Sequence, residues 1–304
     1  MFQATRLVFY YATSPVHMGA GQAVGAIDNP IQREVHTGHP LIAGSGIKGA
    51  LRHHLKRAWN GDADGMLTRL FGPDRNNASD HAGAVSFSDA AIVAFPVRCP
   101  RRAFVYATCP TALARLGRAA AIAGVACGWS PPPVADAKAL TSTACAAIIG
   151  KRLLLEVFDF EAKADATVDR LAAWLAEHAL PAGTENDFFR AKLEQDLVVL
   201  TDADFGHFVR HATVVEPHVC INDKTGTAEG GGLFYTENLP PESVLAGLAM
   251  ASPERSGKGL LEAGEVLATV FNTDGSGRLG RPVQFGGDST TGRGLVTINA
   301  VGGP

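Results

Sequence analysis

The alternation of apolar and polar residues along the chain predicts strands interleaved with helices. Residues 2–12 are rich in β-branched and aromatic side chains, which indicates a strand close to the start of the chain. Farther on, Ile47, Leu51 and Leu55 recur at helical spacing, so a helix is expected from about Ile47 to Trp59, with Ser45 as its N-cap.

The same pattern predicts the remaining elements. In chain order these are a short helix at about 65–71, a pair of short strands within 85–97, Ala-rich helices at 111–123 and 165–180, a strand at 152–162, a mostly helical stretch at 187–211, a proline-capped helix at about 241–250, and a strand at 264–272. Neither a repeat of fixed period nor a convincing linker divides the sequence. We therefore expect one domain over residues 1–304, of the α+β class.

A long hairpin is predicted over residues 214–239. Its two arms carry apolar residues, and they flank an Asn-Asp-Lys-Thr-Gly turn. The turn region from Asn222 to Gly232 is polar and rich in glycine, so this tip has no core of its own. The hairpin is expected to project from the domain and to become ordered against a partner.

Composition limits the class of protein and its surroundings. With 304 residues and a formal net charge of -3, the chain can bury a sizeable core, and any nucleic-acid binding must come from a local basic surface. The five cysteines are widely spaced and contain no C-x-x-C pair, which favours core residues in a reducing compartment. Because the chain shows neither a signal segment nor an apolar run of about 18 residues, we expect a cytoplasmic protein without a membrane partner.

Seven glycines lie between residues 17 and 57, and two uses of so much bare backbone are possible. Residues 44–49 match G-x-G-x-x-G before a helix, with Asp62 or Asp64 downstream, so a nicotinamide-dinucleotide site is one hypothesis. Against it, the apolar run before these glycines is short and the acidic residues fall in a turn.

The second use is binding of a phosphodiester backbone by exposed amides and cations. Lys48, Arg52 and Lys56 are four residues apart and Arg57 lies beside them, so the expected helix carries a basic stripe. On the residues alone, such a stripe is also compatible with an ordinary solvated helix face.

Four segments of the chain carry a resemblance to a known family. They are PVHMGAGQAVGAIDNPIQREVHTGHPLIAGSGIKGALR at 15–52, LFGPDRNNASDHAGAVSFSDA at 70–90, TGTAEGGGLFYTENLP at 225–240 and QFGGDSTTGRGLV at 284–296. In this order they resemble the repeated backbone subunit of type III-B (Cmr) CRISPR effector complexes, a member of the RAMP superfamily. One departure is Gly46, where the family usually has a second serine.

The resemblance implies a fold and a set of partners. The fold would be a modified RNA-recognition motif, a ferredoxin-like palm with inserted fingers and the 214–239 hairpin as thumb. The partners would be guide (CRISPR) RNA, target RNA, further copies of the chain in a filament and the other Cmr subunits, with the protein reading RNA backbone and shape while base pairing reads sequence. The expected guide-binding residues are Gly19, Gly21, Ser45, Lys48, Arg52, Gly287 and Arg293.

The resemblance also implies cleavage of target RNA, with Asp28 as the catalytic residue. Ile27-Asp28-Asn29-Pro30 lies in an irregular loop, where the carboxylate can bind Mg²⁺ or another divalent cation, or orient a 2′-hydroxyl for in-line attack. His17 is a candidate acid or base, and Glu229 and Tyr235 of the hairpin are expected near the phosphate.

Other possibilities stay open from the sequence. Asp28 can instead cap an Asx turn, in which case the chain would be a guide-binding scaffold that does not cleave. A guide-processing RAMP nuclease is another alternative. His207 and His211 have the spacing of a metal-binding pair, but they lack the adjoining glutamate of a zincin and are interpreted as ordinary surface.

Overall fold

A computed structural model gives the structure of residues 2–21, 25–59, 61–62, 65–77, 79–228, 232–257, 259–271, 279 and 281–302. Glu229 and Asp64, both named above, lie outside these residues. The helices are α1 (Gly44–Ala58), α2 (Met66–Phe71), α3 (Pro110–Ile122), α4 (Ala166–His178), α5 (Asp187–Asp196), α6 (Asp202–His211) and α7 (Ala263–Phe271).

Strands make up the rest of the regular structure, apart from two short 3₁₀ turns. They are β1 (Ala4–Ala12), β2 (Leu41–Ile42), β3 (Val85–Phe87), β4 (Ala90–Cys99), β5 (Ala103–Thr108), β6 (Lys138–Thr141), β7 (Arg152–Leu155), β8 (Phe158–Ala164), β9 (Leu197–Val199), β10 (Val214–His218), β11 (Phe234–Asn238), β12 (Val244–Ala251), β13 (Val283–Gln284) and β14 (Leu295–Val301).

Four strands and two helices form a ferredoxin-like palm. Its strands lie in the order β14-β1-β12-β4, and each neighbouring pair is antiparallel. Along the chain, α1 follows β1 and α7 follows β12, which is the β-α-β-β-α-β connection with strand order 4-1-3-2. The α+β class and the ferredoxin-like palm expected from the sequence are therefore found in the structure.

From Leu7 onward β1 is buried on both faces, which explains why residues 7–12 are all apolar or aromatic. Val8 and Tyr10 belong to the core that includes the apolar face of α1 and helix α7. Leu7, Phe9 and Tyr11 belong to a second core against α3 and α4. The palm is thus a central sheet between two helical layers.

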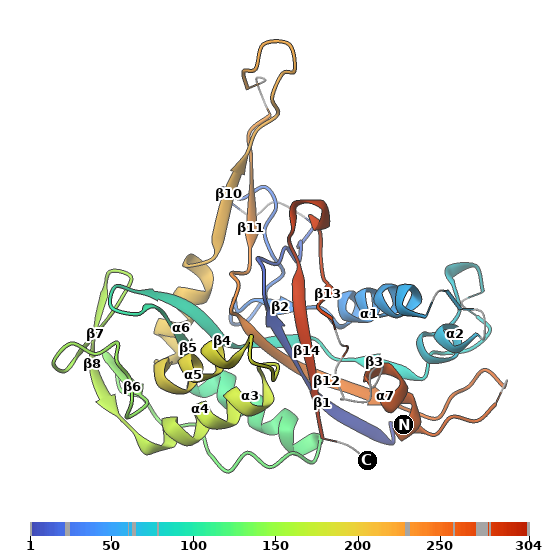
Figure 1. The fold of residues 1–304 in the computed structure, drawn as a ribbon, viewed down its shortest axis with the longest axis horizontal. Helices are drawn as coiled ribbons and strands as arrows, with labels where there is room; N and C mark the ends of the chain where they lie inside the picture. Colours follow the sequence, from blue (N-terminus) through green and yellow to red (C-terminus); the bar gives the residue numbers. More distant parts are fainter. Residues whose placement is uncertain are drawn as a thin grey trace.

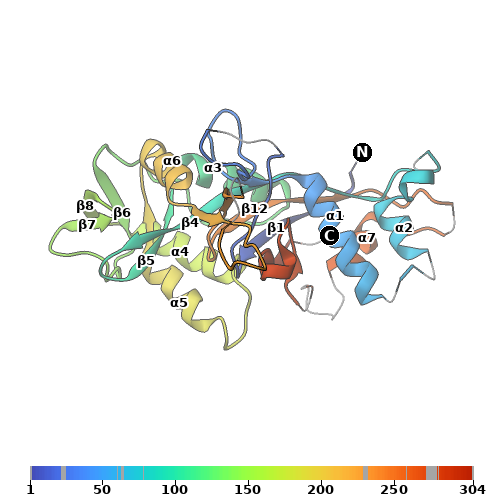
Figure 2. The same ribbon diagram turned by 90° about the horizontal axis from the view of Figure 1, so that it is seen from above.

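A large insertion between β4 and β12 makes the other half of the molecule. The sheet continues through β5, β9, β6, β8 and β7, and helices α3 to α6 accompany these strands. Seen from above, α1, α2 and α7 lie at one end of the molecule, while α4, α5 and β6 to β8 lie at the other (Figure 2).

The predicted hairpin is present as a separate two-stranded sheet of β10 and β11. Val214 pairs with Asn238 and His218 with Phe234, and Pro217 pairs with Tyr235 between them. The two strands rise away from the main body of the molecule (Figure 1). Apolar residues of its arms remain 37–55% exposed: Val215, Val219, Ile221, Leu233, Phe234 and Tyr235.

The helix predicted at 241–250 is wrong, because the segment VLAGLAMA forms β12. This strand lies between β1 and β4, and apolar residues without polar alternation are typical of such a central strand. Gly247 marks the close approach, since a Cβ there would lie 2.9 Å from the carbonyl oxygen of Asp89. Tertiary packing therefore overrides the helix propensity of alanine and leucine.

The strand predicted at 264–272 is also wrong, because Ala263–Phe271 forms helix α7. Its buried residues, Ala263, Val266, Leu267, Val270 and Phe271, follow the helical period, whereas the prediction gave weight to β-branched content.

Two smaller predictions need correction, and the mostly helical stretch 187–211 is found with one added strand. The 152–162 segment is a hairpin of β7 and β8 that turns at Glu156, which has a φ of +53°. The stretch 187–211 contains strand β9 between its two helices. The N-cap of α1 is Ala43, and Ser45 lies within the helix.

None of the helices in the described part of the chain is both long and apolar enough to span a membrane.

One acidic group in the palm makes stability depend on pH. Glu242 precedes β12 with a φ of +70°; it accepts hydrogen bonds from the hydroxyls of Tyr11 and Tyr106, and burial raises its pKa to about 7. A raised pKa means that the folded state binds the proton more tightly than the unfolded state. The contribution of Glu242 to stability is therefore lost as the pH rises from about 4.5 to about 7.

We expect Glu242→Gln to remove this part of the pH dependence. Between pH values of about 5 and 8, the variant should lose less unfolding free energy than the parent, by on the order of 1 kcal/mol because water still reaches part of the side chain. Chemical denaturation across this range measures it, with Glu194→Gln on the exposed face of α5 as control. Parallel pH profiles for the parent and Glu242→Gln would contradict the assignment.

Candidate functional site

The loop that carries Asp28 lies against strand β11 at the base of the hairpin. An Asp28 carboxylate oxygen accepts a hydrogen bond from the amide of Tyr235 at 2.7 Å. The amide of Asn29 donates to the carbonyl of Tyr235 at 3.0 Å, and the carbonyl of Asn29 accepts from the amide of Glu237 at 2.9 Å. The loop thus pairs with β11 in parallel fashion, and the exposed Asp28 is held where the hairpin leaves the palm.

His17 contacts the same strand. Its Nδ1 lies 2.7 Å from the backbone carbonyl oxygen of Glu237. Because a carbonyl oxygen only accepts, Nδ1 is the nitrogen that carries hydrogen, and in the neutral ring Nε2 has a free lone pair. The structure thus brings Asp28, His17 and the backbone of Tyr235 to one stretch of β11.

Three glycines lie directly against His17. A Cβ at Gly19 would lie 3.1 Å from His17 Nε2, and one at Gly286 would lie 2.0 Å from the His17 carbonyl oxygen. The amide of Gly287 donates to that carbonyl at 3.0 Å. Two glycine-rich segments from opposite ends of the sequence therefore meet at His17, and bare backbone leaves Nε2 uncovered.

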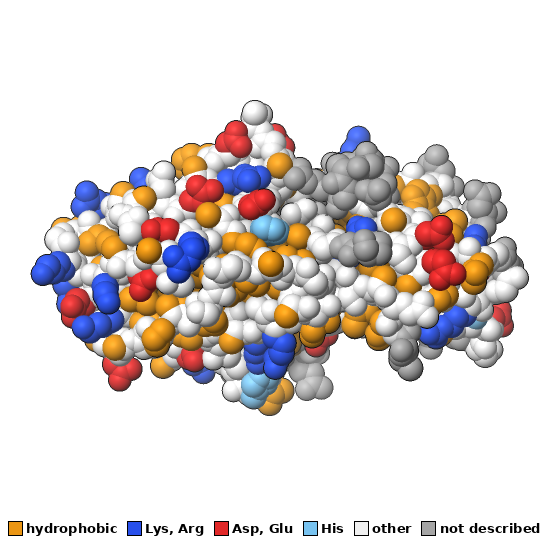
Figure 3. Space-filling view, turned by 90° about the horizontal axis from the view of Figure 1, so that it is seen from below, with side chains coloured by type: hydrophobic (Ala, Val, Ile, Leu, Met, Phe, Trp, Pro, Cys, Tyr) orange, Lys and Arg blue, Asp and Glu red, His pale blue; other side chains and the backbone are white. Residues whose placement is uncertain are grey.

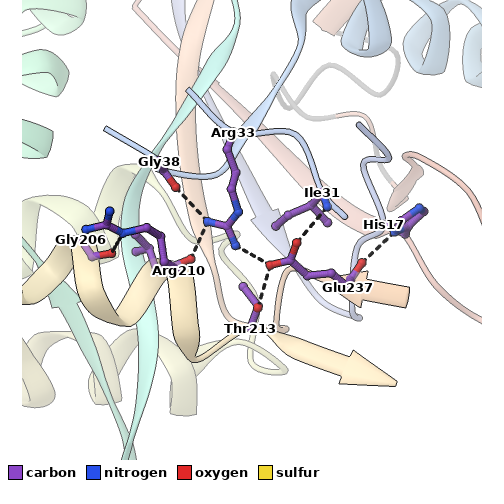
Figure 4. Close-up of polar contacts among 9 residues, drawn as sticks. His17, Ile31, Arg33, Gly38, Gly206, Arg210, Thr213 and Glu237 are labelled. Carbon is purple, nitrogen blue, oxygen red and sulfur yellow. Dashed lines mark hydrogen bonds and ion pairs between the residues drawn. The ribbon is translucent and has the colours of Figure 1, made fainter. Parts of the chain in front are cut away.

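A buried carboxylate ties these segments together. Glu237 is 2% exposed, and its side chain accepts from the amide of Ile31 at 3.0 Å and from the hydroxyl of Thr213 at 2.8 Å. It also forms an ion pair with the guanidinium of Arg33 (Figure 4). One Glu237 side chain in β11 thus joins the first loop to the residue that precedes β10.

Arg33 extends the network to the end of α6. Its Nη1 donates to the carbonyls of Gly38 at 2.9 Å and Val209 at 2.8 Å, while the other arm meets Glu237 (Figure 4). The sequence interpretation missed Glu237, Arg33 and Thr213. Glu237 stands between Thr236 and Asn238 in a hairpin arm, which is only a weak sign of a buried ion pair, because the local sequence pattern does not indicate the partner residue.

Two of the expected guide-binding residues lie beside His17, a third lies in the loop before Asp28, and a fourth contacts the hairpin. Gly19 and Gly287 flank the His17 ring, and Gly21 is exposed with a φ of +82°. Arg293 forms an ion pair with Glu216 of β10. Arg293 therefore connects the second glycine-rich segment to the hairpin.

The other three lie on α1. Ser45 is exposed in the first turn, and Lys48 is half-buried; burial first, and then the charge of Arg52, lower the pKa of Lys48. Arg52 donates to the carbonyl of Gly72 and to Asp74, both at 2.8 Å. The predicted stripe is therefore partly engaged within the protein, with Arg52 only 25% exposed.

The structure contradicts the hypothesis of a nicotinamide-dinucleotide site at residues 44–49. The sheet around residues 44–49 is antiparallel, whereas that site requires parallel strands. The amide of Gly44 already donates to Asp89 at 2.7 Å, and the Asp62 carboxylate caps α2 through the amides of Leu67 and Thr68. The helix terminus and the acidic residue that the cofactor would need are occupied.

Within the described residues no group of three or more His, Cys, Asp or Glu side chains is arranged to hold a metal ion. His207 and His211 are exposed on α6, with ring centroids 4.7 Å apart, beside Phe158. His39 is buried against Phe205, and that burial lowers its pKa. Within the part of the chain that the structure describes, none of these three side chains is hydrogen-bonded to the Asp28 loop.

The face turned away from the hairpin carries positive and negative side chains side by side, with apolar ones between them (Figure 3). Such mixed charge does not favour a long polyanion.

Comparison with known proteins decides the family. A family model described as the RAMP superfamily matches residues 9–297. The chain belongs to the RAMP superfamily. The resemblance found in the four sequence segments is thereby confirmed.

Individual RAMP relatives resemble the chain over nearly its whole length. A curated Pyrococcus furiosus protein, "CRISPR system Cmr endoribonuclease Cmr4", is 32% identical over 295 residues, which cover 96% of this chain and 94% of that protein. A crystal structure of oligomeric Cmr4 from Pyrococcus furiosus matches with a TM-score of 0.73 at 24% identity, covering 97% of each chain. A chain of a type III-B Cmr-beta structure bound to cognate target RNA matches with a TM-score of 0.71 at 20% identity, covering 98% of each.

The contact between Gly286 and His17 gives a test of how the site is built. Gly286→Ala should lower the unfolding free energy by at least about 2 kcal/mol, because φ is +68° and the new Cβ would overlap the His17 carbonyl. Gly46→Ala is the matched control: it lies in α1 with open space around it and should raise stability by up to about 1 kcal/mol. Equal stabilities for the two variants, measured by denaturant titration, would refute this packing.

Proposed function

We propose that this RAMP protein is a backbone subunit of a type III-B CRISPR effector complex, in which several copies bind one guide RNA and each cleaves the paired target RNA. Support comes from the superfamily, from a 32% identical relative named a Cmr endoribonuclease, and from likeness in fold to Cmr structures. On this proposal the other partners are the remaining Cmr subunits and further copies of the chain.

The observation that carries the proposal is the placement of Asp28. An exposed carboxylate, fixed by the Tyr235 amide, stands at the base of a projecting hairpin and among glycine-rich loops. Exposed amides and bare backbone allow an RNA strand to approach closely. The hairpin can then cross the guide–target duplex and displace a nucleotide beside Asp28, at a cost of a few kcal/mol in stacking.

The chemistry that fits one carboxylate is attack by the RNA on itself. The 2′-oxygen of the target forms a bond to the adjacent phosphorus while the bond from phosphorus to the 5′-oxygen breaks. A base removes the proton of the 2′-hydroxyl, and an acid protonates the leaving oxygen, which gives a 2′,3′-cyclic phosphate and a 5′-hydroxyl. Asp28 orients the hydroxyl, and the free Nε2 of His17 exchanges a proton with one of these oxygens.

A divalent cation such as Mg²⁺ would fit this donor set with Asp28 as its protein ligand. Asp28 has a second carboxylate oxygen, and Mg²⁺ is commonly held by one or two carboxylates, water and substrate phosphate. When bound, such an ion neutralises charge on the phosphate. The protein's own residues contribute position: β11 fixes Asp28, and glycines leave His17 uncovered.

Guide binding is assigned to Gly19, Gly21, Ser45, Lys48, Arg52, Gly287 and Arg293. The proposal requires Arg52 and Arg293 to share their charge between RNA phosphates and their present carboxylate partners, Asp74 and Glu216. Glu229 and Tyr235 are proposed to lie near the cleaved phosphate, Tyr235 through its partly exposed ring.

Asp28→Asn should abolish target cleavage while guide and target affinity stay within about twofold of the parent. The amide oxygen still accepts from Tyr235, so folding is expected to be unchanged, but the negative charge is lost. The measurement is the product ladder of assembled complex with labelled target RNA and Mg²⁺, with Asp136→Asn, an exposed loop residue, as control. Cleavage at the parental rate by Asp28→Asn would leave the scaffold function as the better account.

Replacing Lys48 and Arg52 together by glutamine should make guide binding less dependent on salt. Each lost phosphate contact lowers the slope of log affinity against log salt by roughly 0.7, so the pair should lower it by about 1.4. The control, Lys151→Gln with Lys163→Gln, removes two exposed lysines near β7 and in β8. Slopes that match the parent in both double variants would show that the α1 stripe does not touch the guide.

A further inference from the structure

Glu237 contacts His17, the segment directly after Asp28 and two side chains at the base of the hairpin, and each of its polar groups is used. Its amide donates to the carbonyl of Asn29 at 2.9 Å, and its carbonyl oxygen lies 2.7 Å from His17 Nδ1. Its carboxylate accepts from the amide of Ile31 at 3.0 Å, from Thr213 and from Arg33 (Figure 4). A single residue therefore holds His17 on one side and the segment directly after Asp28 on the other.

We propose that Glu237, held by Arg33, is a positioning residue that fixes His17 and Asp28 relative to each other and imposes the Nδ1–H tautomer on His17. Its importance for cleavage rests on the function proposed above. Its effect on His17 is a property of the folded chain and can be tested separately.

The Asp28 loop is restrained at three of its residues, Asp28, Asn29 and Ile31. The amide of Tyr235 binds the Asp28 carboxylate, both backbone groups of Asn29 pair with β11, and the amide of Ile31 ends on the Glu237 side chain. The first two restraints need only a strand. The third needs an acceptor on the side chain of residue 237, and it stops the loop from peeling away from β11.

Stability alone does not account for an ion pair in this place. Removing a carboxylate from water is costly, and apolar residues of similar size commonly stabilise a core as well or better. The ion pair fixes the orientation of the Glu237 carboxylate, because its partner Arg33 is itself fixed by the carbonyls of Gly38 and Val209. A fixed orientation is what groups that act on one phosphate require.

The tautomer of His17 follows from the same residue. A hydrogen on Nδ1 satisfies the Glu237 carbonyl and leaves Nε2 as the acceptor, on the side that Gly19 keeps open. If residue 237 shifts, this hydrogen bond lengthens and both tautomers of the ring become populated.

The first experiment reads His17 directly in the free protein. With ¹⁵N-labelled histidine, the ring nitrogens are recorded at about pH 8, where imidazoles are ordinarily neutral, and His17→Gln identifies the His17 signals among the ten histidines. The parent should show His17 in the Nδ1–H form. Glu237→Gln and Arg33→Met should shift both ring nitrogens toward averaged values: the first opposes an amide N–H to the N–H donors around the carboxylate, and the second leaves the buried carboxylate without its ion-pair partner.

Glu254→Gln is the matched control. Glu254 is likewise a buried glutamate, 7% exposed, and it pairs with Arg69, away from the hairpin. Its variant should lose a comparable amount of stability but leave the His17 signals as they are in the parent. Thr213→Val gives a milder change, since it removes one donor to Glu237, and it is read in the same way if Glu237→Gln does not fold.

The second experiment measures assembled complex under single-turnover conditions. Glu237→Gln should cleave target RNA at least tenfold more slowly with target affinity within twofold of the parent, Thr213→Val several-fold more slowly, and Glu254→Gln at the parental rate. Unchanged His17 signals in folded Glu237→Gln or Thr213→Val, or equal loss of cleavage in Glu237→Gln and Glu254→Gln, would overturn the proposal. If the parent itself does not cleave, the proposed function fails, while the ¹⁵N result still decides the role of Glu237.

Discussion

The ion pair between Glu237 and Arg33 is the constraint on which the candidate site depends. Glu237 is 2% exposed, and a carboxylate this buried must be paired and hydrogen-bonded. Its partners, the amide of Ile31, the hydroxyl of Thr213 and the guanidinium of Arg33, must therefore lie next to it in the folded protein. These partners come from the first loop, from the chain entering β10 and from a side chain anchored at α6. The energetic demand of one buried charge thus determines how three distant segments meet.

This arrangement separates a rigid base from an adaptable tip. The palm has a strand buried on both faces and two helical layers, whereas β10 and β11 form a two-stranded sheet that would be marginal by itself. The base of the hairpin is stabilised by Glu237 and by the Arg293–Glu216 pair. Toward the tip the apolar side chains are exposed, which leaves them available to another surface.

The sequence was enough to locate much of the palm and the motifs, but not the side-chain contacts that connect the motifs. The periodicity of Ile47, Leu51 and Leu55 predicted α1 well, while β12 and α7 were exchanged because composition was given more weight than period. His17, Asp28 and Gly287 were named from their segments, and the structure brings them to one place. Glu237 and Arg33 were not named, because a pairing across about 200 residues leaves no local pattern.

Pro217 protects the hairpin against aggregation, which its exposed apolar residues would otherwise favour. A free two-stranded ribbon has two open edges, and rows of unpaired amides on such edges recruit further strands into aggregates. Proline in β10 has no amide hydrogen, so it interrupts one of these rows in the middle of the strand. Apolar side chains can therefore stay exposed on this hairpin while Pro217 limits the addition of further strands along the β10 edge.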